Sequence, residues 1–174
     1  MTSRQELCEL LKTAFNSECV KPSDFPQLDL YIDQILTVFD TALGCEESKE
    51  KPLTKSMINN YSKEKLLTPI KGKTYPRQQI LELLAIFQLK NTLPMSDIKL
   101  VLDSIRTDEN CPELLTQLLE QTAEITVDNH GLSDISSDPD RKECLKLLLE
   151  MSRKAYLYRK ACEALVEQCF EQSK

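Results

Sequence analysis

Apolar residues recur three and four residues apart along most of the chain, which is the spacing of one face of an α-helix. Such runs predict helices over residues 3–16, 28–44, 54–62, 77–91, 96–105, 112–125 and 140–172. Glycine is scarce, at three residues, and each glycine falls where a helical run stops. The pattern therefore predicts a mainly helical protein with little β-structure.

Residues 53–67, LTKSMINNYSKEKLL, combine a short helical run with amides and lysines. Thr54 is a suitable N-cap residue, and Met57, Ile58 and Tyr61 share one helical face. A helix of about nine residues is unstable alone. We therefore expect it to pack against its neighbours through this face.

The segment LLTPIKGKTYP (66–76) contains two prolines and a glycine. These residues predict a small β-hairpin or extended wing with Lys71, Gly72 and Lys73 at its tip. Between residues 51 and 100, nine cations stand against three anions, a balance of +6 in a chain of net charge -6. A basic middle between acidic flanks is typical of an anion-binding module, and the alternative is a solvated lysine surface.

The last predicted helix carries a heptad-like seam of nearly four repeats, beginning at Cys144. Such a seam either packs on the acidic helices of the same chain or forms a subunit interface. The second interpretation predicts a homodimer through Leu148, Met151, Ala155, Tyr158, Cys162, Leu165 and Cys169.

Residues that carry catalysis or hold a metal are sparse. The seven cysteines are odd in number and form no C-x-x-C pair, so free thiols in a reducing compartment are expected. The single histidine, His130, lies in a polar loop where solvation is the expected role. No phosphate-binding glycine loop or nucleophile elbow occurs. We expect no catalysis, metal or cofactor.

No secretory signal or apolar run of membrane-spanning length occurs, so a cytoplasmic protein without membrane contact is expected.

Several segments together resemble the bacterial domain-of-unknown-function family numbered eighteen thirty-six. They are LDLYIDQIL, MINNY, KLL, Y-x-R and LPMSDIKLVL. The resemblance covers roughly residues 2 to 105, and the family implies no particular activity.

The same stretch is more distantly similar to the DNA-binding half of MerR-type regulators. The likeness rests on Thr54, Met57, Ile58, Asn59, Asn60-Tyr61, Leu66-Leu67, Lys73, Tyr75, Leu83, Ile86 and Leu89. Asn59 and Asn60 stand where those proteins carry arginine and tyrosine, and Lys65 stands where they carry glycine. The likeness implies a winged helix-turn-helix with a small β wing. The apolar spacing adds a helical C-terminal region that ends in a long helix.

This organisation divides the chain into an N-terminal helix and connector (1–27), a MerR-like winged-helix domain (28–107) and an acidic helical region for dimerisation or sensing (108–174). The expected function is a transcriptional regulator that binds double-stranded DNA. The alternative is a winged-helix adaptor that binds protein. The expected DNA-binding residues are Thr54, Lys55, Asn59, Asn60, Tyr61, Lys63, Lys71, Lys73, Tyr75 and Arg77. Nothing in the sequence indicates a small-molecule effector.

Overall fold

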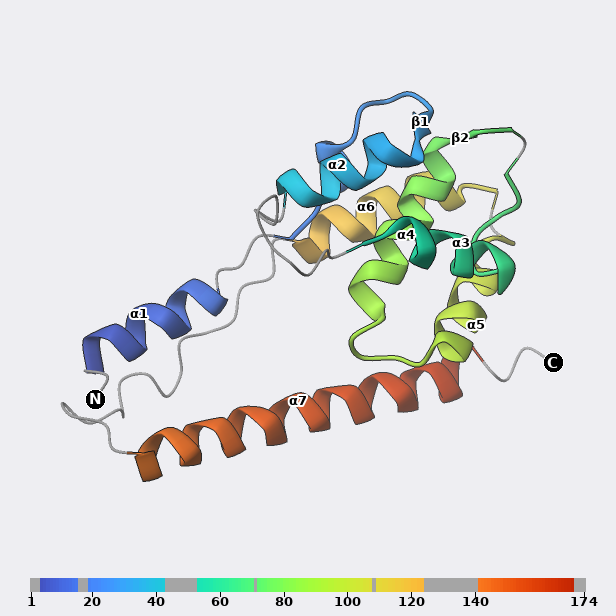
Figure 1. The fold of residues 1–174 in the computed structure, drawn as a ribbon. Coiled ribbons are helices and arrows are strands. Elements are labelled where there is room, and N and C mark those ends of the chain that lie inside the picture. Colours follow the sequence, from blue (N-terminus) through green and yellow to red (C-terminus); the bar gives the residue numbers. More distant parts are fainter. Residues whose placement is uncertain are drawn as a thin grey trace. The chain divides into compact units, whose positions relative to one another are not determined.

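The computed structural model describes residues 4–15, 19–42, 53–70, 72–107, 109–123 and 141–170. These residues form seven α-helices, one 3-10 helix and one two-stranded antiparallel sheet (Figure 1). The elements in chain order are α1 (Arg4–Phe15), η1 (Pro22–Asp24), β1 (Leu30–Tyr31), α2 (Ile32–Ala42), α3 (Lys55–Lys63), β2 (Thr74–Tyr75), α4 (Arg77–Leu89), α5 (Met95–Ile105), α6 (Cys111–Ala123) and α7 (Arg141–Cys169). The predicted mainly helical architecture is confirmed. Lys71 and the polar loop with His130 lie outside the described residues.

Contacts divide the chain into two units. One unit comprises Met1–Ser17 and Ile125–Ala161, and it contains α1 and most of α7. The other comprises Glu18–Glu124 and Cys162–Lys174. Within this second unit α6 packs against α4 and η1. The contacts thus group α6 with the helices before it, whereas the sequence-based division assigned it to the C-terminal region.

Helix α4 is the centre of the second unit. Every residue from 79 to 86 is buried, so the helix is enclosed around its whole circumference. It contacts α5 and α6, and the Phe87 ring meets the edge of Phe39 of α2 at a centroid distance of 5.2 Å. The helical spacing of apolar residues predicted that only one face of α4 points into the core. The structure extends the core to Leu81 and Ala85 on the other faces.

The two-stranded sheet differs from the predicted hairpin. Strand β2 pairs with β1, in the register Leu30–Tyr75 and Tyr31–Thr74, and residues 66–70 form no strand. The Thr68 N–H instead donates to a carboxylate of α4, and its carbonyl accepts from an amide of α4. Because these backbone groups bond to side chains, they cannot form a strand ladder. The hairpin alternative is therefore wrong.

Helix α2 begins four residues later than the helical pattern predicted. Leu28, the first residue of the predicted helix, is 57% exposed, and residues 30–31 form β1. Further along this helix, Ile35 and Phe39 are fully buried, as their helical spacing predicted. The extended start of this segment arises because Leu30 pairs with β2, an interaction that local periodicity does not reveal.

None of the described helices is long and apolar enough to span a membrane. The described ranges also contain no group of three or more histidine, cysteine or acidic residues arranged to hold a metal ion.

Candidate functional site

Helix α3 begins at the hydroxyl cap that the sequence predicted. The Thr54 backbone is extended, and its Oγ1 accepts a hydrogen bond from the Met57 N–H at 3.2 Å. This bond satisfies one of the backbone donors left unpaired at a helix start. The cap fixes where a helix of only nine residues begins.

The inner face of α3 packs into the core as predicted. Ile58 is fully buried, Tyr61 is nearly so, and Met57 is partly buried against the same cluster. Burial raises the pKa of the Tyr61 hydroxyl, and the nearby charge of Glu64 raises it further. The packing orients α3 through its apolar side chains and leaves its other face in solvent.

That outer face consists of exposed amide, hydroxyl and ammonium groups. Lys55, Asn59 and Lys63 follow one another at intervals of four residues, and Ser56 and Asn60 lie beside them. Lys55 forms an ion pair with Asp33 of α2 at 2.6 Å, with both side chains more than half exposed. Solvent screens a pair of this kind, so it contributes little to stability.

The end of α3 is closed by two backbone hydrogen bonds of the Schellman type. The Leu66 N–H donates to the Tyr61 carbonyl at 2.8 Å, and the Lys65 N–H donates to the Ser62 carbonyl at 3.2 Å. Lys65 adopts a φ of +59°, and it is the one non-glycine residue with positive φ in the described part of the chain. Glycine usually occupies this position because it has no Cβ to clash.

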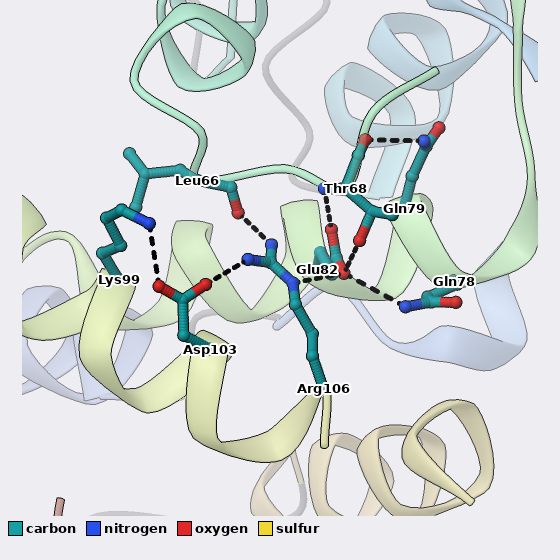
Figure 2. A network of polar contacts seen from close by, with 8 residues as sticks. All are labelled: Leu66, Thr68, Gln78, Gln79, Glu82, Lys99, Asp103 and Arg106. Atoms are coloured by element: carbon teal, nitrogen blue, oxygen red, sulfur yellow. Dashed lines mark hydrogen bonds and ion pairs between the residues drawn. The ribbon is translucent and has the colours of Figure 1, made fainter. Parts of the chain in front are cut away.

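A buried carboxylate on α4 holds the segment that follows α3 (Figure 2). Glu82 is fully buried, and its Oε2 accepts from the Thr68 N–H at 2.8 Å while its Oε1 accepts from the Thr68 hydroxyl. The neighbouring Gln79 donates its amide to the Thr68 carbonyl at 2.8 Å. A buried charge requires such partners, and Thr68, in the segment that connects α3 to β2, supplies two of these hydrogen bonds.

Arg106, just beyond α5, completes this network (Figure 2). Its Nε donates to Glu82 Oε1 at 2.9 Å, and its other nitrogens donate to Asp103 Oδ1 and to the Leu66 carbonyl. Burial lowers the pKa of Arg106, but the hydrogen bonds and charges of Glu82 and Asp103 outweigh that effect and raise it overall. The guanidinium therefore links α4, α5 and Leu66 in the segment after α3.

The remaining predicted DNA contacts lie around β2. Lys73 is exposed and follows Gly72, whose φ of +119° suits glycine and few other residues. Tyr75 is buried in the core, and burial raises its pKa. Arg77 donates to the Pro22 carbonyl at 2.9 Å and so ties α4 to η1.

The structure describes nine of the ten predicted residues, all but Lys71, and separates them into two groups. Lys55, Asn59, Asn60 and Lys63 share the outer face of α3, and Lys73 is exposed next to β2. The side chains of Thr54, Tyr61, Tyr75 and Arg77 instead cap a helix, fill the core or bind backbone carbonyls. Each of these four side chains therefore has an intramolecular role, and its role as a DNA contact stays a prediction.

The Glu82 network was absent from the sequence interpretation. Its signal was a charged residue inside the strongly apolar run RQQILELLAIFQL, where burial on all sides requires a partner. The partners Thr68 and Arg106 lie 14 and 24 residues away, so spacing along the chain could not identify them.

The seam of α7 divides into buried and exposed parts. Cys162 packs against the core of the second unit, together with the off-seam residues Val166 and Phe170. Leu148, Tyr158 and Leu165 are 61%, 74% and 61% exposed. The buried residues therefore support packing within the chain, and the exposed residues support a subunit contact.

A family model described as Domain of unknown function (DUF1836) matches residues 20–123. The chain belongs to this family. The DUF1836 match ends at the last residue of α6 and includes α3, the Glu82 network and β2. No curated protein and no solved structure matches the chain significantly.

Proposed function

We propose that this DUF1836 protein is a DNA-binding transcriptional regulator, in which residues 28–107 act as a MerR-like winged helix. In this proposal α3 enters the major groove and the loop before β2 tracks the phosphates. The observation that carries it is the outer face of α3, where exposed amides and lysines stand on a helix whose opposite face is anchored in the core.

The chemistry of this face suits a DNA groove. Asparagine can pair bidentately with adenine, and lysine neutralises phosphates. Asn59 and Asn60 are both exposed, and Lys63 lies one turn beyond Asn59. The excess of six positive charges between residues 51 and 100 supports an anionic partner in a chain that is acidic overall.

The Glu82 network supports the proposal because it supplies rigidity. Recognition needs side chains held within a fraction of an ångström of their contacts. Glu82 and Arg106 bind the backbone at Thr68 and Leu66, immediately after α3. These bonds hold the backbone from Leu66 to Thr68 against α4 and the end of α5.

The test is the salt dependence of binding to duplex DNA, measured by fluorescence anisotropy of the purified protein. The logarithm of the binding constant should fall linearly with the logarithm of salt concentration. Lys63→Ala and Lys73→Ala should each reduce the slope by about one. Asn59→Ala should weaken sequence preference, measured by selection from a random duplex pool, while leaving the slope unchanged.

Matched controls lie elsewhere on the chain. Asn91, in the turn after α4, and Lys154, on α7, are exposed residues of the same types. Asn91→Ala and Lys154→Ala should leave both the slope and the sequence preference unchanged. Absence of salt-dependent binding to any duplex would refute the proposal.

The exposed apolar residues of α7 favour a second candidate, a protein-binding adaptor. Leu148, Tyr158 and Leu165 offer a partner surface that needs no nucleic acid. This candidate predicts a protein complex that survives moderate salt, contains no nucleic acid and is lost in Leu148→Glu and in Tyr158→Glu, which leave the core of the second unit intact. Salt-dependent DNA binding that persists in these variants would favour the regulator instead.

A further inference from the structure

A pocket of about 390 Å³ lies beside the end of α3. This volume falls within the range of roughly 300–1,000 Å³ that is typical of small-molecule sites. Three segments line it: the end of α3, the loop that follows, and the region from α5 to the residue just after it. The lining residues are Ser62, Lys65, Leu67, Thr68, Pro69, Ile70, Lys99, Asp103 and Arg106.

The lining carries a surplus of positive charge. Lys65, Lys99 and Arg106 contribute three cations, and Asp103 contributes one carboxylate. Asp103 accepts from Lys99 at 2.8 Å and from Arg106 at 2.7 Å. The buried Glu82 behind Arg106 neutralises a second cation, which leaves a net charge of one. A ligand with a single negative charge would therefore balance the site.

Donor groups remain for such a ligand. An ammonium has three N–H donors and a guanidinium has five. Lys99 uses one donor on Asp103, and Arg106 uses three on Glu82, Asp103 and Leu66. No hydrogen bond or ion pair involves the side chain of Lys65 among the residues that the structure describes. The pocket thus holds unused cationic donors.

The backbone of Lys65 is a second, independent observation. Its φ of +59° lies in the left-handed region, where a Cβ is unfavourable and glycine is the usual residue. Strained residues persist where surrounding structure holds them, and they cluster at functional sites. Glycine would close α3 with less strain, but it would remove the ammonium from the pocket.

We propose that this pocket binds a small organic anion, whose carboxylate lies between Lys65 and Lys99 and whose apolar body packs on Pro69 and Ile70. The apolar wall distinguishes this ligand from an inorganic ion, which would leave the wall in water. The single surplus charge disfavours a polyanion. The site is defined by the protein alone, so the proposal stands whether or not the chain binds DNA.

The test uses benzoate as the probe, with benzyl alcohol as its neutral counterpart and acetate as a carboxylate without the ring. Titration calorimetry of the full chain should show binding of benzoate that is at least about tenfold tighter than that of either comparison compound, because only benzoate uses both the cations and the apolar wall. Amide chemical shifts of Ser62 and Ile70 should move on addition of benzoate and remain unchanged on addition of acetate.

Substitutions at Lys65 separate charge from folding. Glycine suits the left-handed backbone, so Lys65→Gly should keep the protein folded. It should weaken the binding of benzoate about tenfold. Lys65→Arg should retain binding, and Lys154→Ala on α7 should not affect it. Equal binding of benzoate and benzyl alcohol, or of benzoate and acetate, would overturn the proposal. So would full benzoate affinity in Lys65→Gly, or shift changes confined to residues outside the pocket.

Discussion

Glu82 of α4 and Arg106, just beyond α5, form an ion pair in which Glu82 Oε1 lies 2.9 Å from Arg106 Nε, with the carboxylate fully buried. A buried pair of this kind does not by itself increase stability, because both ions lose water. Here each partner also binds the backbone of the segment after α3. The pair therefore determines where that segment lies.

Glu82→Gln tests the role of the buried charge. The substitution keeps the shape of the side chain but leaves Arg106 without its buried counter-ion. We expect the free energy of unfolding to fall by roughly 2–4 kcal/mol, measured by urea denaturation. Glu167→Gln, on the exposed surface of α7, is the control and should change it by less than about 0.5 kcal/mol. Equal stability of the two variants would show that the charge of Glu82 is dispensable.

Thr54→Ala tests the cap of α3. Loss of the Oγ1 acceptor leaves the Met57 N–H without its partner and should lower stability by about 1 kcal/mol. Thr54→Ser keeps the acceptor and should restore most of the loss. Urea denaturation measures the free energy of unfolding of both variants. Identical midpoints for the alanine and serine variants would mean that the hydroxyl does not hold the helix start.

The sequence predicted most of this region from local patterns. The hydroxyl side chain of Thr54 identified it as a helix N-cap, and helical spacing placed Ile58 on the inner face. Both predictions are confirmed. The pairing of β2 with β1 could not be predicted in this way, since the partner strand lies more than 40 residues earlier. The roles of Tyr75 and Arg77 could not be predicted either. A polar residue next to a basic loop looks the same in sequence whether it faces solvent or the core.

Asp103 should make stability depend on acid pH. Burial raises the pKa of this carboxyl, but the hydrogen bonds and charges of Lys99 and Arg106 outweigh that effect and hold it below its ordinary value of 3.8. A carboxyl with a depressed pKa in the folded state stabilises the fold fully above its unfolded pKa. That contribution is lost as pH falls through the folded-state pKa.

Asp103→Asn removes this contribution. The free energy of unfolding, measured from pH 6 down to about pH 2.5, should differ between wild type and variant at the upper end and converge at the lower end. Parallel curves over this range would contradict the assignment of the pH dependence to Asp103. High salt should reduce the stability difference between wild type and Asp103→Asn at pH 6 only in part. Arg106 is mostly buried, so salt screens its charge less.

Charged substitutions on α7 test whether its exposed apolar residues join two copies of the chain. Leu148 and Tyr158 belong to the predicted seam and are exposed, whereas Ala164 is exposed but lies off the seam. If the seam forms a homodimer, light scattering of the wild type at tens of micromolar should give twice the chain mass of 20.0 kDa. Leu148→Glu and Tyr158→Glu should each give the single-chain mass, since a carboxylate would have to be buried in the interface. Ala164→Glu should remain a dimer. A wild-type mass of 20.0 kDa would instead leave α7 without a subunit role.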